Sequence, residues 1–421
     1  MKSNQKSSKI SGFYKLPIDK RIKIIKDFSE LSNDDIQSLN TPIDMTLADT
    51  MIENVIGTFE LPIGIAMNFV INGKDMIVPM VVEESSVVAA ASNAAKIARI
   101  HGGFTTKISN PLMIGQIQIL GVDDIATAVQ KIKEKKEEIL QVANAQDQIL
   151  VNLGGGAKDL EIRILETSDH KMIVIHLIVD VRDAMGANAV NTMVEALAPI
   201  FEELTGGYIR LKILSNLADK RIAKATAVFD KERMGGEKVI DAFLESYTLA
   251  CIDPYRAATH NKGIMNGIDA VILATGNDFR AIEAGAHTYA ARDGQYTSLT
   301  RYYKNGEGNL VGEIELPVAV GIVGGVGSIH PKAKLCKKIL GIKTAAQLSD
   351  VIASVGLAQN FAAIFALSTV GIQKGHMSLH AKNIAMMAGA TKDEIDKVAE
   401  IMIIEGKVKM DRAKEIIESI R

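Results

Sequence analysis

One stretch of the chain, from about residue 112 to residue 215, constrains the fold more than any other. Within it the apolar residues change repeatedly between strand-like alternation and helix-like spacing. The segments in chain order are a strand at 115–121, a helix at 125–145, strands at 160–165 and 172–181, a helix at 189–204 and a strand at 208–214. This β-α-β-β-α-β order predicts a split βαβ, or ferredoxin-like, unit. We expect it to be one inserted domain.

The flanking sequence predicts a larger mixed domain and a helical tail. Before the insertion the predicted elements are helices at 22–28 and 45–56, strands at 63–71 and 76–82 around the turn Asn72-Gly73, and a helix at 86–100. After it they are a helix at 237–250, a buried strand at 270–274, a helix at 279–292, a strand at 316–323 and a buried helix at 357–367. The sequence therefore predicts an α+β fold with a large domain (1–111 and 216–373), the small inserted domain (112–215) and a C-terminal helical domain (374–421).

Charge, cysteine content and hydropathy exclude several classes of protein. The 421 residues contain 48 Lys and Arg against 50 Asp and Glu, whereas a general nucleic-acid binder would carry a basic excess. Two cysteines, Cys251 and Cys336, are too few for a disulfide framework or a Cys-rich zinc site. No apolar segment follows the N-terminus, and polar residues interrupt the uncharged stretch 351–373, so we expect neither a signal peptide nor a membrane span. These features predict a soluble cytoplasmic protein.

Two clusters of polar residues could supply acid–base chemistry. Glu83-Glu84-Ser85-Ser86 lies between a predicted strand and a helix, where helix capping is the favoured interpretation and a reactive carboxyl is the alternative. In the second cluster, Lys262 is expected in a loop before the 270–274 strand and Asp278 just beyond it. A lysine held beside a carboxylate could stabilise an oxyanion, but Asp278 could equally be a helix N-cap and Lys262 a solvated charge. The residues alone leave both readings open.

Two further clusters could bind ligands. His376 and His380 are four residues apart, as on one helix face, but Met377 stands where a zinc-binding His-Glu-x-x-His motif requires Glu, so we expect no metal. A structural histidine or a general acid remains possible there. The small residues of 183–188 (DAMGAN) could expose backbone N–H groups to a phosphate, or could form an ordinary turn. The chain has neither the Rossmann glycine fingerprint after a strand nor a P-loop.

Six motifs together resemble one enzyme family. They are 53–62 (ENVIGTFELP), 81–84 (VVEE), 183–188 (DAMGAN), 260–267 (HNKGIMNG), 275–278 (TGND) and 371–377 (GIQKGHM). In type and order they are similar to those of 3-hydroxy-3-methylglutaryl-CoA (HMG-CoA) reductase in its soluble, class II form. The resemblance runs from about Asn40 to near the end of the chain.

The resemblance implies a four-electron reduction of HMG-CoA to mevalonate and free CoA by two NAD(P)H, or the reverse oxidation. The family would use the inserted domain as a non-Rossmann dinucleotide platform and the terminal helices as a flap. An obligate homodimer with its active site between the subunits is implied, and in this family such dimers often assemble into a hexamer; the sequence leaves the choice between dimer and hexamer open. Neither a metal, nor nucleic acid, nor a membrane is implied as a partner.

The resemblance also assigns residues. The catalytic set falls on Glu84, Lys262, Asp278 and His376. Substrate contacts fall on Ser86, Arg256, Asn266 and His380. Cofactor contacts fall on Asp147, Asp183, Met185, Gly186, Asn188 and Asn216. Lys262 and Asp278 would stabilise the oxyanion, His376 would protonate the departing thiolate, and Glu84 would donate a proton in the second step.

Asp147 bears on the choice of cofactor. It aligns with an acidic residue that faces the adenosine ribose in NAD-preferring members of the family. A carboxylate accepts a hydrogen bond from a ribose 2′-OH and repels a 2′-phosphate, so we expect NADH to be preferred over NADPH.

Two alternative functions remain open from the residues. One is another CoA-thioester enzyme, an acyltransferase or hydrolase, although no G-x-S-x-G motif or reactive-looking cysteine motif is present. The other treats the ferredoxin-like segment as a ligand-sensing module.

Overall fold

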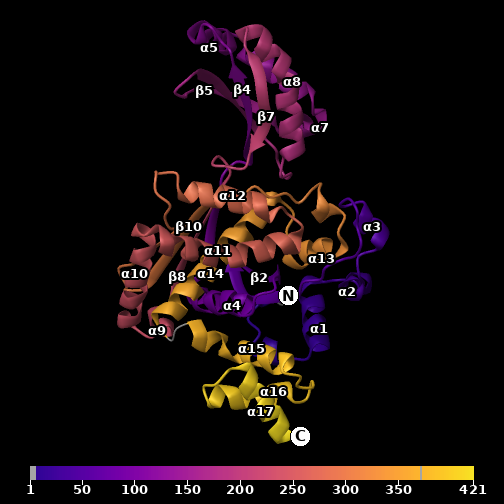
Figure 1. Ribbon diagram of the computed structural model, residues 1–421, viewed down its shortest axis with the longest axis vertical. Coiled ribbons are helices and arrows are strands. Elements are labelled where there is room, and N and C mark those ends of the chain that lie inside the picture. Colours follow the sequence, from indigo (N-terminus) through magenta and orange to yellow (C-terminus); the bar gives the residue numbers. More distant parts are fainter. Residues whose placement is uncertain (1–5, 370–371) are drawn as a thin grey trace, which may run out of the picture.

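The protein is built around two separate β-sheets with helices packed on them (Figure 1). The computed structural model describes residues 6–369 and 372–421, and for residues 372–379 it describes the backbone alone. The four-stranded sheet and its helices lie at one end of the molecule, and the C-terminal helices lie at the other (Figure 1). The mixture of two sheets with many helices confirms the α+β prediction.

The larger sheet has the order β2-β1-β3-β8-β10-β9. Its strands are β1 (Ile63–Ile71), β2 (Lys74–Val81), β3 (Phe104–Ile108), β8 (Ile222–Phe229), β9 (Thr300–Lys304) and β10 (Leu310–Pro317). The β1–β2 hairpin turns at Asn72 and Gly73, whose φ angles of 49° and 75° are those that an Asn-Gly turn adopts readily. This hairpin confirms the strand pair predicted from sequence. The insertion separates β3 from β8, yet the two strands pair antiparallel in the same sheet.

The smaller sheet has the order β5-β6-β4-β7, and each neighbouring pair is antiparallel. Its strands are β4 (Leu112–Leu120), β5 (Gly156–Glu166), β6 (Lys171–Asp180) and β7 (Tyr208–Ser215). The helices between them are α5 (Ile125–Glu134), α6 (Lys136–Ala145), α7 (Gln148–Asn152) and α8 (Ala187–Thr205). This is the split βαβ topology that the periodicity predicted. The predicted single helix at 125–145 is interrupted at Lys135, between α5 and α6.

Ten helices of the described chain precede, connect or follow the strands of the larger sheet. They are α1 (Ile18–Ser29), α2 (Asn33–Asn40), α3 (Met45–Asp49), α4 (Val87–Ala98), α9 (Lys231–Met234), α10 (Glu237–Ile252), α11 (Pro254–Thr275), α12 (Phe279–Ala290), α13 (Pro331–Leu340) and α14 (Ala345–Ser368). Helices α4, α11 and α14 contact one another and strands of the sheet, which places α11 in the interior.

Three sequence expectations were wrong in this region. Residues 270–274, expected as a buried strand, form the last turns of α11, because a short apolar run cannot by itself distinguish a buried strand from a buried helix. The predicted 316–323 strand ends at Pro317, the last residue of β10. The helix expected at 45–56 ends at Asp49.

Helix α14 has the length and hydropathy of a membrane span, but 67% of its most apolar window is buried inside the protein. Its residues from Val351 to Phe361 are all buried. This agrees with the core helix predicted from the polar interruptions in the sequence.

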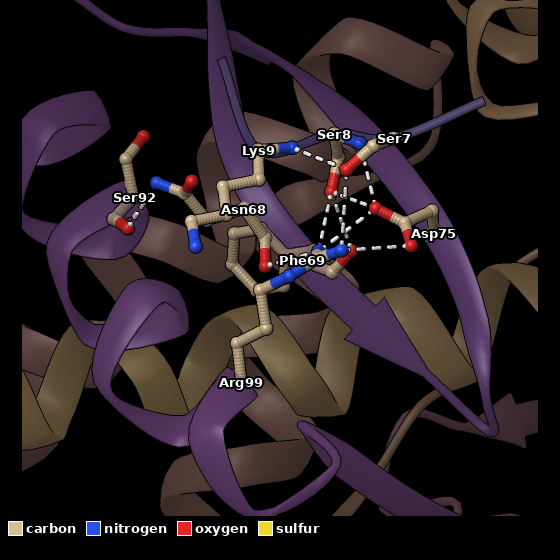
Figure 2. A network of polar contacts seen from close by, with 8 residues as sticks. All are labelled: Ser7, Ser8, Lys9, Asn68, Phe69, Asp75, Ser92 and Arg99. Carbon is tan, nitrogen blue, oxygen red and sulfur yellow. Dashed lines mark hydrogen bonds and ion pairs between the residues drawn. The ribbon is translucent and has the colours of Figure 1, made fainter. Parts of the chain in front are cut away.

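A small network of hydrogen bonds and one ion pair connects the N-terminal segment to the β1–β2 hairpin (Figure 2). Ser8 is fully buried, and its hydroxyl donates to the carbonyl of Phe69 at 2.9 Å. Arg99 binds both carboxylate oxygens of Asp75 at 2.8 and 2.9 Å, and Ser8 donates its backbone N–H to the same carboxylate. Burial opposes the charged form of Asp75, but the bonds from Arg99 and Ser8 outweigh it and lower the pKa of this carboxyl.

The C-terminal helices have an apolar core of their own. They are α15 (Ile372–Met387), α16 (Ile395–Ile404) and α17 (Met410–Ile420). Val398, Met402 and Ile416 are at the centre of this cluster, which is separate from the main core. The three short helices predicted beyond residue 373 are therefore confirmed.

Candidate active site

The side chains of Glu84 and Lys262 meet across the turn between β2 and α4. Lys262 Nζ lies 3.0 Å from Glu84 Oε2, although the two residues are 178 positions apart in the chain. Both side chains remain accessible, with exposed fractions of 62% for Lys262 and 41% for Glu84. The structure thus brings together two of the four residues assigned as catalytic and leaves them open to a ligand.

The turn that carries Glu84 is held in an unusual backbone conformation. Ser86 has a φ of 74° as the N-cap of α4, and its side chain makes no capping hydrogen bond. The favoured capping interpretation is therefore wrong for Ser86. A non-glycine residue in the left-handed region costs free energy, and such residues concentrate at functional sites.

Lys262 belongs to α11 and not to a loop, contrary to the sequence expectation. Asn266 follows it by four residues and so lies on the same helix face, half-buried. Arg256 is half-buried at the start of α11, where burial lowers the pKa of its guanidinium. Three of the assigned substrate or catalytic residues therefore come from one helix.

Asp278 lies beyond the opposite end of α11. Its carboxylate accepts hydrogen bonds from the backbone N–H groups of Arg280 and Ala281 at 3.0 and 3.2 Å, which makes it the N-cap of α12. From Lys262 to Thr275 the helix rises about 20 Å, so Lys262 and Asp278 do not meet within one chain. Asp278 therefore caps a helix, as one of the two interpretations expected, and its carboxylate does not contact Lys262 within the described single chain.

A cavity of about 830 Å³ opens beside Asp278. The first turns of three helices, α8, α12 and α13, contribute to its wall. Helix N-termini carry unpaired N–H groups and partial positive charge, which favours anionic ligands. Arg280 and Lys332 add two cationic side chains to the wall.

Four of the assigned cofactor residues line this cavity: Asp147, Met185, Gly186 and Asn188. Gly186 has a φ of 102° at the N-cap of α8, and a Cβ there would meet Val181 at 2.5 Å, so the turn requires glycine.

The other two assigned cofactor residues do not line the cavity. Asp183 accepts a hydrogen bond from the N–H of Ala345 at 2.7 Å, at the start of α14, and Asn216 is exposed at the end of β7. The structure thus places four of the six assigned cofactor residues on the cavity wall and two outside it.

Arg221 is a residue of this region that sequence reasoning missed. Its guanidinium is buried and donates to the carbonyls of Ala184, Met185 and Val320. Burial lowers its pKa to about 10. Arg221 therefore fixes the 183–188 turn against the chain beyond β10, and nothing in local periodicity signals that role.

The predicted flap histidines lie in α15. His376 falls within the backbone of this helix, but its side chain is outside the described residues. His380, one turn later, is exposed. Among the described residues, no group of three or more His, Cys, Asp or Glu side chains has an arrangement that could hold a metal ion.

Comparison with known proteins decides the family. A family model described as hydroxymethylglutaryl-coenzyme A reductase matches residues 17–381. The chain belongs to the HMG-CoA reductase family. It is 56% identical over 416 residues to the 3-hydroxy-3-methylglutaryl-coenzyme A reductase of Archaeoglobus fulgidus, covering 99% of this chain and 95% of that one.

Two other relatives support the assignment. A probable HMG-CoA reductase of Borreliella burgdorferi is 39% identical over 380 residues, covering 88% of this chain and 85% of that one. The class II reductase of Streptococcus pneumoniae, solved with NADPH in open conformations, superposes with a TM-score of 0.82 at 41% identity, covering 96% of this chain and all of that one. These matches confirm the family, the fold class and a nicotinamide-dependent oxidoreductase activity predicted from the six motifs.

Proposed function

We propose that Glu84, Lys262, Asp278 and His376 carry out the reduction of HMG-CoA to mevalonate and CoA. The observation that carries this proposal is the 3.0 Å ion pair between Lys262 and Glu84, which sets a cation beside an acid on an accessible surface. Both groups are needed, because reduction of a thioester develops negative charge on its carbonyl oxygen, and reduction of the resulting aldehyde consumes a proton.

The division of labour follows from the chemistry of each group. The Lys262 ammonium stabilises the oxyanion, and Glu84 donates the proton as mevaldehyde becomes mevalonate. His376 protonates the CoA thiolate and so prevents it from adding back. Asp147 and the 185–188 turn on the cavity wall would hold reduced nicotinamide dinucleotide, which would supply the hydride.

We infer that the complete site forms between two copies of the chain. Within one copy, about 20 Å of helix separates Lys262 from the end of α11 next to Asp278. The 53–62 motif also exposes large apolar side chains, with Ile56 fully exposed and Phe59 89% exposed. Tyr255, at the start of α11, is 88% exposed. Large apolar side chains that are exposed to solvent often mark a protein–protein interface. We take the partner to be a second copy of the chain, in a homodimer that can assemble further into a hexamer.

The small sheet and the terminal helices then have distinct roles. Residues 112–215 form the dinucleotide platform, supported by the position of Asp147 and the 185–188 turn on the cavity wall. Residues 374–421 form a flap, supported by their separate apolar core. A flap that opens would allow the spent cofactor to be exchanged between the two reductions. We place the enzyme in the cytoplasm, in keeping with two free cysteines and a buried α14.

We further propose that NADH is preferred over NADPH. Asp147 Oδ1 accepts from the N–H of Leu150 at 2.9 Å as the N-cap of α7, which holds the carboxylate at the cavity wall. Its charge would repel a 2′-phosphate. In an Asp147→Asn variant, which keeps a capping oxygen, the preference for NADH should fall by roughly tenfold in kcat/KM. Tighter binding of NADPH than NADH by the unaltered protein would contradict the proposal.

A stoichiometric assay tests the reaction itself. Addition of HMG-CoA to enzyme and NADH should oxidise about two cofactors for each CoA thiol released, as a two-hydride reduction requires. Thiol release without cofactor oxidation would indicate a hydrolase and overturn the proposal.

A second assay tests the roles of the two side chains. For each variant, the loss of rate is measured with HMG-CoA and with mevaldehyde as the substrate. Glu84→Gln should lose more activity on mevaldehyde than on HMG-CoA, and Lys262→Ala should not show this bias. Equal losses for both variants on both substrates would refute the assignment of separate steps.

A further inference from the structure

His330 lies on the wall of the same cavity, at the N-cap of α13. Its ring is half-buried, and its Nδ1 accepts hydrogen bonds from the backbone N–H groups of Lys332 and Ala333 at 3.2 and 3.4 Å. An imidazole in the role usually taken by Ser, Thr, Asp or Asn is an unusual cap. Its size leaves the second ring nitrogen available for another contact.

The two backbone donors determine the tautomer. A nitrogen that accepts from two N–H groups cannot carry a proton, so the neutral ring carries its proton on Nε2. Among the described residues, Nδ1 makes both hydrogen bonds of this ring, and Nε2 makes none with the protein. The pKa of His330 is lowered, because burial and the neighbouring charge of Lys332 outweigh a hydrogen bond to the residue's own backbone that acts in the opposite direction, and this favours the neutral form.

The two cationic side chains on the same cavity wall are already engaged in ion pairs. Lys332 Nζ lies 3.7 Å from Glu60, and Arg280 lies 3.3 Å from Asp278, so both cations on this wall are already paired with acids of the same wall. The N–H groups at the start of α13 face His330 itself. The Nε2–H of His330 is thus a hydrogen-bond donor on this wall that is available to a ligand.

We propose that neutral His330 donates its Nε2–H to an acceptor oxygen of the dinucleotide, making it a cofactor-binding residue outside the six assigned from sequence. This inference rests on the proposed cofactor site and adds a contact to it. The N-cap fixes both the tautomer and the direction of the ring, so the donor is held in place before the cofactor binds.

A pair of variants separates cofactor binding from helix capping. His330→Ser keeps a good N-cap but removes the donor, whereas His330→Ala removes both. His101→Ser, at a histidine that pairs with Asp230 at 3.1 Å outside the cavity wall, is the matched control. The measurements are the NADH dissociation constant by fluorescence titration, the KM for NADH and for HMG-CoA, and the thermal midpoint of each apo protein.

We expect His330→Ser to weaken NADH binding roughly tenfold, the loss of one hydrogen bond, with the KM for HMG-CoA and the thermal midpoint unchanged. His330→Ala should show the same loss of affinity together with a lower midpoint, and His101→Ser should bind NADH normally. Unchanged NADH affinity in His330→Ser would overturn the inference, as would a loss seen only in His330→Ala. Failure of the wild-type protein to bind either dinucleotide would instead overturn the proposed cofactor site itself.

Discussion

Mixing two inactive variants tests whether the active site is shared between chains. Lys262 pairs with Glu84 of its own chain, while Asp278 caps α12 beyond about 20 Å of helix. In a symmetric dimer, one site would then combine Glu84 and Lys262 of one copy with Asp278 of the other. Lys262→Ala and Asp278→Asn should each be inactive alone, and the Asn substitution retains the N-cap of α12.

The activity expected after reassembly follows from counting the intact active sites. When equal amounts of the two variants are dissociated and reassembled, about half of the dimers contain one copy of each. A mixed dimer has one site with both defects and one with neither, so the mixture should recover roughly a quarter of the wild-type specific activity. The assay is NADH oxidation with HMG-CoA before and after reassembly.

A second mixture is the control. Glu84→Gln and Lys262→Ala alter the two members of an ion pair within one chain, so every site of their mixed dimer retains one defect. That mixture should stay inactive. Recovery there, or no recovery with Lys262→Ala and Asp278→Asn, would refute the shared site.

Three further predictions concern stability. Burial and the adjacent Glu283 carboxyl raise the pKa of Asp269 to about 8, so its contribution to stability is complete only below the unfolded pKa of about 4 and is lost as the pH rises from there through 8. The melting temperature of Asp269→Asn should therefore rise relative to the wild type with increasing pH, with a clearly larger difference at pH 9 than at pH 5. The pKa of Asp75 is lowered, so the Asp75 carboxylate stabilises the fold at pH values above the pKa of the unfolded state, and this stabilisation is lost as the pH falls through the folded pKa. Asp75→Asn should therefore lower the free energy of unfolding, measured with denaturant, by about 3 kcal/mol at pH 7 and by much less at pH 3. Arg221→Met should lower the unfolding free energy by about 3 kcal/mol and raise the KM for NADH, because one buried and two partly buried carbonyls lose their donor; an unchanged KM would show that the 183–188 turn does not depend on Arg221.

Much of the fold is determined locally and was readable from the sequence. The split βαβ order between residues 112 and 215 follows from period-2 and period-3.6 apolar spacing, and the β1–β2 hairpin follows from the left-handed preference of Asn72-Gly73. The motifs around Glu84 and Lys262 likewise predicted the family correctly. Each of these signals depends on residues close together in the chain.

The tertiary structure alone decided the spatial relations. Residues 270–274 became helix because the whole of α11 packs against α14, which a five-residue apolar run could not reveal. The ion pair between Glu84 and Lys262, the distance from Lys262 to Asp278, the buried guanidinium of Arg221 and the tautomer of His330 all depend on contacts between remote segments. Periodicity records which face of an element is buried, but the partner against which that face packs is selected only when the whole chain has folded.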